Sequence, residues 1–250
     1  MKKMIVFLAV LLLSTVSVLA QEKKPDAKPA ALPSVDEVLD KYVKALGGKE
    51  AVEKVTSRMG KGVFEIEAMN MSGSLEMYQQ APNKMAMNID LGGVGKVNQV
   101  FDGAKAWSAD PMQGLRELTG AELAQMKLGA EFYRDLKLKQ LYPKITVSGK
   151  ETVAGKDTYV LVATPSEGPA EKWYFSVETG LMVRQDSEEA GPDGKMTVEA
   201  YLEDYRAVDG VKTPFVIKRV TPMMGMTIKF TEVKQNTTIE EAKFAKPSGQ

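Results

Sequence analysis

The sequence predicts a mainly β protein that also contains α-helix: one large, curved antiparallel sheet, or half-open β-barrel, covered by two or three amphipathic helices. The first observation is that apolar and polar residues alternate over residues 57–110 and again after residue 144, as in half-buried strands. The second is that the turns between these segments are short, which indicates antiparallel neighbours. The third is that two segments with helical spacing of apolar residues precede and interrupt the strands.

The N-terminal residues predict export. A positively charged start, an apolar run over residues 4–16 and a Val-Leu-Ala ending are typical of a cleavable signal peptide. The run is shorter than the roughly 20 residues of a membrane-spanning helix, so we expect a signal peptide over residues 1–20, with an uncleaved anchor as the alternative. Residues 21–33, rich in Lys, Pro and Ala, predict a flexible tether, and residues 34–250 a single domain. We therefore expect the mature protein in the periplasm, with secretion as the alternative.

Two helices are predicted by capping boxes, in which a hydroxyl and a carboxylate satisfy free backbone amides at a helix start. The first box is SVDE at residues 34–37, and the glycines at residues 47–48 predict the end of that helix. The second box is TGAE at residues 119–122. Apolar residues follow each box at helical spacing and give each helix one apolar face: Val35, Val38, Leu39, Tyr42, Val43 and Leu46 in the first, and Leu123, Met126, Ala130 and Tyr133 in the second.

About twelve strands are predicted on typical strand lengths, five before the second helix and seven after it. Before that helix, turns are predicted at residues 72–73 (SG), 82–83 (PN) and 92–93 (GG), Asp102-Gly103 predicts a hairpin, and residues 110–114 (DPMQG) predict a break in the sheet. The strands expected after the second helix cover residues 145–151, 158–164, 172–177, 181–187, 196–205, 215–221 and 227–233.

The composition disfavours several classes of function. The chain has no Cys and no His, so Ser-His-Asp and Cys-His nucleophile systems are excluded, and so are the common zinc sites. Removal of the predicted signal peptide leaves acidic residues in excess by two, which argues against a nucleic-acid partner. We expect no cofactor, no metal and no enzymatic activity. An enzyme that uses carboxylates alone is the alternative that the composition leaves open.

Three stretches resemble the outer-membrane lipoprotein-sorting protein family, the periplasmic carriers of lipoproteins or lipids. They are residues 38–48 (VLDKYVKALGG), residues 101–114 (FDG through Trp107 to DPMQG), and residues 173–214 (WYF, TGL and YRAVDGVKTP), followed by Phe230, Val233, Asn236, Ile239 and Phe244. The resemblance implies an unclosed β-barrel whose apolar cavity is covered by helices and carries acyl chains. In these carriers an arginine on the sheet helps to hold the helices closed. No motif matches Arg58 or any other arginine here to that role, which stays unassigned.

Methionine and the large aromatic residues supply the candidate binding site. The chain has 15 methionines, and a flexible, polarisable side chain suits a wall that adapts to an apolar ligand. Gap filling in an ordinary core is the alternative for any single one of them. The residues predicted to form the cavity wall or lid are Leu39, Tyr42, Leu46, Met85, Met87, Ile89, Leu91, Trp107, Met126, Tyr133, Trp173 and Phe175.

Taken together, these patterns favour a periplasmic protein that holds a lipid acyl chain or a lipidated protein in a cavity under its helices, with an envelope membrane protein as a further partner. The alternative is an envelope sensor or scaffold domain of the same fold. Such a domain would bind a protein partner in the same concavity or by strand addition at a sheet edge.

Overall fold

The computed structural model describes residues 31–191 and 194–248. The predicted signal peptide and residues 21–30 of the predicted tether lie outside the described residues and stay predictions. The chain from Leu32 onward forms one compact unit. Within the described part of the chain, no helix combines the length and the apolar character needed to cross a membrane.

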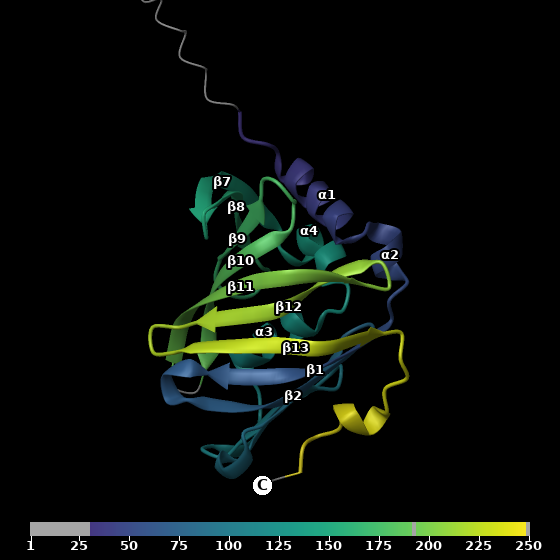
Figure 1. Cartoon of the computed structure of the whole chain (residues 1–250), viewed down its shortest axis with the longest axis vertical. Helices are drawn as coiled ribbons and strands as arrows, with labels where there is room; N and C mark the ends of the chain where they lie inside the picture. The colour runs from purple at the N-terminus through teal and green to yellow at the C-terminus, as the bar shows by residue number, and fades with distance from the viewer. Residues whose placement is uncertain (1–30, 192–193, 249–250) are drawn as a thin grey trace, which may run out of the picture. The chain divides into compact units, whose positions relative to one another are not determined.

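A single antiparallel sheet of 13 strands dominates this unit (Figure 1). Its strand order is β6-β5-β4-β3-β2-β1-β13-β12-β11-β10-β9-β8-β7. The sheet does not close, because β6 and β7 are its two edges, while β1 pairs with β13 in its middle. The strands are β1 (Ser57–Ile66), β2 (Met71–Gln80), β3 (Lys84–Asp90), β4 (Lys96–Phe101), β5 (Ala106–Asp110), β6 (Gly114–Glu117), β7 (Lys144–Val153), β8 (Lys156–Thr164), β9 (Glu171–Ser176), β10 (Met182–Gly191), β11 (Gly194–Val208), β12 (Val211–Val220) and β13 (Gly225–Gln235).

Short helices accompany the sheet and confirm the predicted fold class, a half-open β-barrel with helices. The α-helices are α1 (Val35–Leu46), α2 (Lys49–Glu53), α3 (Gly120–Ala130) and α4 (Leu138–Leu141), and the 3-10 helices are η1 (Glu67–Met69), η2 (Gly92–Val94), η3 (Arg134–Leu136) and η4 (Glu241–Phe244). The strands predicted after residue 144 are all present, and most of them are a few residues longer than predicted.

The capping box predicted for α1 is confirmed. The Ser34 amide donates to Glu37 Oε2 at 2.7 Å, and the Glu37 amide donates to Ser34 Oγ at 3.2 Å. The helix ends at Gly47, whose φ of 126° favours glycine. A Cβ at this position would lie 2.2 Å from the backbone oxygen of Gly210, so glycine also permits a close approach of the two segments.

The second predicted capping box is wrong. Thr119 precedes α3, but its side chain makes no capping hydrogen bond. The Arg116 guanidinium instead binds the Glu122 carboxylate with two hydrogen bonds of 2.7 and 2.8 Å. A forked, charge-assisted pair is stronger than a neutral cap, so Glu122 binds Arg116 in place of completing the box. Tyr133 is also not on the apolar face of this helix, because α3 ends at Ala130.

Three further details of the strands before α3 differ from the prediction or refine it. Residues 72–73 lie inside β2, where Gly73 lets the backbone of β3 approach closely, since its Cβ would lie 2.2 Å from the Asp90 oxygen. Residues 110–114 form a turn in which the Asp110 carboxylate accepts two amides, and the sheet continues as β6, which gives six strands before α3. The hairpin at Asp102-Gly103 is confirmed, with residues 102–105 between the strands.

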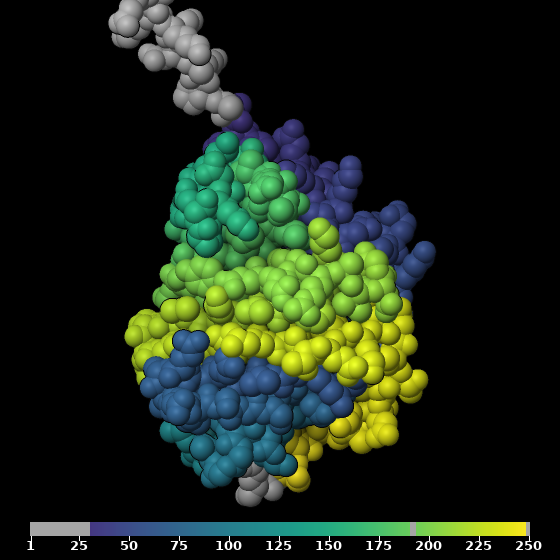
Figure 2. Space-filling view, in the orientation of Figure 1, coloured from purple at the N-terminus to yellow at the C-terminus, as the bar shows by residue number. Residues whose placement is uncertain are grey.

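Alternation along the strands separates the two faces of the sheet. Phe64 and Ile228 are direct cross-strand partners on the inner face, and their neighbours Glu65 and Lys229 form an ion pair on the outer face. Figure 2 shows this outer face, which is formed here by the neighbouring strands β11, β12, β13 and β1. The inner face therefore carries the apolar residues that position the site described next.

Candidate ligand-binding cavity

A cavity of about 720 Å³ lies between α3 and the inner face of the sheet. Helix α3 contacts β4 on one side and β10 on the other, so it bridges strands that are far apart in the strand order. Small-molecule sites typically have volumes of about 300 to 1,000 Å³. The cavity therefore has the size of a ligand-binding site.

Apolar side chains form much of the cavity wall. Met85, Met87 and Ile89 alternate with outward residues along β3, so all three face inward. Across the cavity, Met126 comes from α3. The large apolar residues of the lining are Phe64, Ile66, Met85, Met87, Ile89, Leu91, Val97, Leu118, Met126, Leu128, Ile217, Met226 and Ile228.

A buried carboxylate organises the polar part of the lining. Glu171, at the start of β9, is 8 % exposed and accepts hydrogen bonds from Trp173 Nε1 at 2.7 Å and Gln185 Nε2 at 3.0 Å. The Tyr142 hydroxyl also donates to Glu171 at 3.0 Å, and Arg134 Nη2 lies 3.3 Å from the same carboxylate. Because the donors come from η3, from the residue after α4, from β9 and from β10, this network ties the segment after α3 to β9 and β10.

Burial and charge act in opposite directions on the Arg134 guanidinium. Desolvation lowers its pKa, but the neighbouring Tyr142 oxygen and the Glu171 carboxylate raise it more, so the pKa stays above its ordinary value. Desolvation is also the main reason why the pKa of the Tyr142 hydroxyl is raised. Arg134 is thus a permanent cation and Tyr142 a neutral donor. Arg134 Nε is buried and has no hydrogen-bond partner among the described residues.

Two more arginines line the cavity, and both are paired with lining glutamates. Arg116 binds Glu122 through both terminal nitrogens. Arg219 Nη2 on β12 lies 2.6 Å from Glu189 Oε2 on β10. The second pair joins strands that are separated by β11 in the sheet.

The Gln125 side chain fastens helix α3 to β10. The pairing of β10 with β9 ends at Asp186, so the β9-facing edge of β10 has no strand partner beyond that point within the described part of the chain. Gln125 on α3 takes this place: its Nε2 donates to the Glu188 carbonyl at 3.0 Å, and its Oε1 accepts from the Ala190 amide at 3.0 Å. The amide group imitates a neighbouring strand and holds α3 over the cavity.

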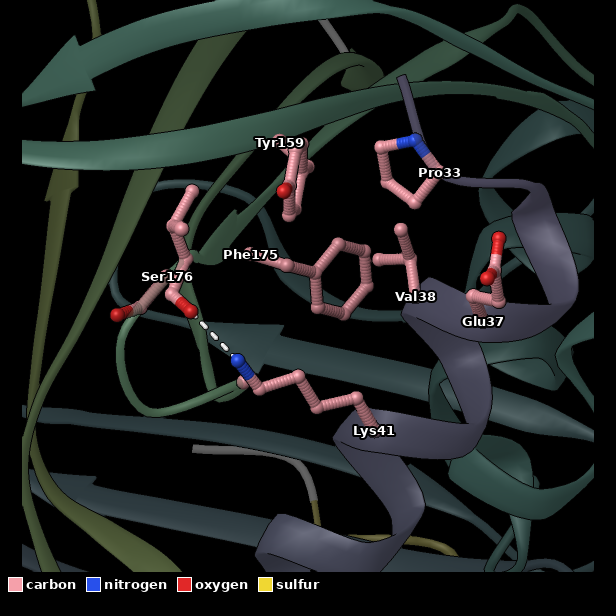
Figure 3. Close-up of a pocket in the computed structure, with 9 residues that line it drawn as sticks. Pro33, Glu37, Val38, Lys41, Tyr159, Phe175 and Ser176 are labelled. Atoms are coloured by element: carbon pink, nitrogen blue, oxygen red, sulfur yellow. Dashed lines mark hydrogen bonds between the residues drawn. The ribbon is translucent and has the colours of Figure 1, made fainter. Parts of the chain in front are cut away.

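A second, smaller pocket of about 190 Å³ lies beside α1 (Figure 3). Lys41 reaches across it and donates to the Val177 carbonyl, and the Phe175 ring and Val38 approach each other from β9 and α1. The volume is below the range typical of small-molecule sites. We therefore treat the cavity under α3 as the main candidate site.

The structure brings five of the predicted wall residues together in the larger cavity: Met85, Met87, Ile89, Leu91 and Met126. Of the other predicted residues, Leu39, Tyr42, Leu46, Trp173 and Phe175 are buried in a core between α1, α4 and the β8–β9 part of the sheet, and Tyr133 packs against that core. Trp107 belongs to a separate cluster with Val100 and Phe244. Ligand binding by these twelve residues stays a prediction.

Helix α1 covers filled core. The Tyr42 and Phe175 rings are 5.1 Å apart in an edge-to-face arrangement, and the Tyr142 and Trp173 rings are 4.5 Å apart. The lining of the larger cavity contains no residue of α1 among those described. Of the two predicted helices, α3 alone lies over this cavity.

Sequence reasoning missed the polar residues of the site. Glu171 on β9 pairs across the sheet with buried Ala163, and Gln185 on β10 pairs with buried Trp173. Directly opposed residues share a face, so both polar residues face inward. The signal that could have identified Glu171 is its spacing: it stands two residues before Trp173 and so shares its face. Gln125 and Arg219 carry no comparable signal in the sequence.

Three solved structures share the fold. A DUF1329 family protein from Desulfovibrio piger has a TM-score of 0.59 and 14 % identity over 84 % of this chain and 97 % of its own. A putative outer membrane lipoprotein-sorting protein domain from Vibrio parahaemolyticus has a TM-score of 0.54 and 11 % identity over 82 % and 97 %. A LolA superfamily protein from Nitrosomonas europaea has a TM-score of 0.55 and 11 % identity over 86 % and 99 %.

Sequence identities of 11–14 % establish a shared fold and nothing beyond it. The resemblance to outer-membrane lipoprotein-sorting proteins is therefore confirmed as a likeness of fold. No protein-family model matches the chain, and no curated protein matches it in sequence.

Proposed function

We propose that this protein is a periplasmic carrier that holds an acyl chain of a lipid or lipidated protein in the cavity under α3, and that it performs no catalysis. The observation that supports this most strongly is a cavity of about 720 Å³ with a wall rich in methionine and aliphatic side chains. Burial contributes about 0.8 kcal/mol per CH₂, or roughly 12 kcal/mol gross for a 16-carbon chain. Binding therefore does not need charge recognition.

The predicted signal peptide supports the periplasmic location, and the shared fold supports a carrying or holding role. Flexible methionines at Met85, Met87 and Met226 would let the wall adapt to chains of different shape. Because α3 spans the cavity, loading and release would require α3 to move away from β10 or β4. Movement away from β10 would break the two bonds of Gln125 to the β10 backbone.

The test is direct binding with a matched pair of variants. The mature protein should bind a fluorescent fatty acid or a fluorescent monoacylglycerol, and an organic extract should contain acyl lipid by mass spectrometry. Ile228→Trp places an indole in the cavity and should weaken binding by at least about tenfold, a loss of 1.4 kcal/mol. Met223→Trp adds the same group at a side chain that is 80 % exposed and should not affect binding. A folded protein that binds neither probe and contains no lipid would contradict the proposal.

A second function is supported by the open edges of the sheet. Among the described strands β7 pairs only with β8, so the other side of its ten-residue backbone has no strand neighbour there and could accept a strand from a protein partner. In this case the protein would be an envelope sensor or scaffold. Purification from an envelope extract separates the two functions, because a stoichiometric protein partner together with a lipid-free cavity would favour the sensor.

A further inference from the structure

We propose that the cavity accepts acyl ligands whose head group is uncharged, such as an acylglycerol or another acyl ester, and discriminates against free fatty acids. This inference rests on the proposed function, because it concerns the ligand of the same cavity. It comes from the arrangement of charges in the lining, where each cation already has an acidic partner.

The two arginines on opposite sides of the cavity are not available to an anion. Arg116 presents its fork to Glu122 with bonds of 2.7 and 2.8 Å, and Arg219 binds Glu189 at 2.6 Å. A ligand carboxylate could reach either guanidinium only by displacing a carboxylate that belongs to the protein. The new pair would be no stronger than the old one, and the displaced glutamate would be left without its partner, so this exchange is unfavourable.

The charge of Arg134 is also compensated by a carboxylate, and this carboxylate is buried. Its Nη2 donates to Tyr142 at 2.7 Å and lies 3.3 Å from Glu171, which is held in place by Trp173 and Gln185. An anionic head group at Arg134 would meet this fixed carboxylate as a like charge at close range. A neutral carbonyl or hydroxyl oxygen would not be repelled.

The remaining charges of the lining are acidic. The lining contains five glutamates, which are Glu122, Glu167, Glu171, Glu188 and Glu189, and three arginines. Lys195, outside the lining, pairs with Glu188 at 2.7 Å. Glu167 has no ion-pair partner among the described residues, and its side chain is exposed. The described lining thus offers no free cation to an anion, while most of its acids are already neutralised, so an uncharged head group fits best.

The experiment compares ligands that share one chain. Monopalmitoylglycerol, methyl palmitate, palmitate at pH 8 and hexadecylamine compete with a fluorescent monoacylglycerol for the mature protein. We expect the two neutral esters to bind at least about tenfold more tightly than palmitate, the effect of a single uncompensated like charge, and more tightly than the amine. Palmitate or hexadecylamine binding as tightly as the esters would overturn the inference and leave the carrier function intact.

The second part of the experiment looks for a variant that binds palmitate more tightly. Glu189→Gln removes the acid that binds Arg219, so the ratio of the palmitate to the monopalmitoylglycerol dissociation constant should fall about tenfold. Glu203→Gln is the matched control, because it also removes one acid from an ion pair, with Lys218, but on an exposed site outside the cavity. Circular dichroism checks that both variants fold. An equal ratio in the two variants would contradict the inference, and failure of every ligand to bind would remove the proposed function together with it.

Discussion

The fastening of α3 by Gln125 gives the prediction that can be worked out furthest. Gln125→Leu keeps a side chain of similar size on the helix but removes both bonds to the β10 backbone. At about 1 kcal/mol net for each bond, the closed position of α3 should lose about 2 kcal/mol, which increases the fraction of open molecules about 30-fold. The Ala190 amide would lose its side-chain acceptor and become exposed whenever α3 opens.

Hydrogen exchange at Ala190 measures this directly. We expect its exchange rate in Gln125→Leu to increase by about one order of magnitude or more, and the association rate of an acyl probe to rise with it. Gln140→Leu is the matched control, because Gln140 lies exposed on α4, away from the cavity lining. Equal exchange at Ala190 in the two variants would refute the idea that this side chain holds α3 closed.

Three further predictions concern stability. Glu171→Leu leaves two buried donors, Tyr142 and Trp173, and two half-buried ones, Arg134 and Gln185, without this acceptor and should reduce the free energy of unfolding by about 3–5 kcal/mol in urea titrations; a loss below 1 kcal/mol would contradict the network. The backbone and hydroxyl bonds of Ser34 lower the pKa of Glu37, so the capping box stabilises the fold above the ordinary glutamate pKa of 4.5 and is lost as the pH falls through the lowered value. Ser34→Ala should therefore destabilise at pH 7 and matter less at pH 3, and equal effects at the two values would be evidence against the box. Gly47→Ala forces a Cβ to within 2.2 Å of a backbone oxygen at a φ of 126° and should cost at least about 1–3 kcal/mol, whereas Gly93→Ala, in open space, should be close to neutral in thermal unfolding.

The fold could be predicted because its signals are local. Alternation with a period of two identifies the strands, and the short turns between them require antiparallel neighbours. The capping box at Ser34 was predictable for the same reason, since both partners lie within one helical turn. The box at Thr119 failed because Arg116, outside the four-residue motif, competes for Glu122. A motif of four residues contains no information about such a competitor.

The candidate site was less predictable, because an inward position does not tell whether the space beyond it is filled. Met87 and Trp173 both face inward, yet Met87 lines the cavity and Trp173 is completely buried in a solid core. Which of the two occurs depends on where α3 and α1 lie, and this is decided by contacts between distant parts of the chain. The polar residues were missed for a related reason: a glutamate in a strand is read as outward unless its partners are known.

Photo-crosslinking with an acyl ester that carries a diazirine near the end of its chain tests the central claim most directly. If the acyl chain lies under α3, the labelled peptides should contain residues 85–91 of β3 and its continuation, residues 226–228 of β13, or Met126 of α3. Labelling confined to exposed apolar residues such as Met112 and Met223 would contradict the account.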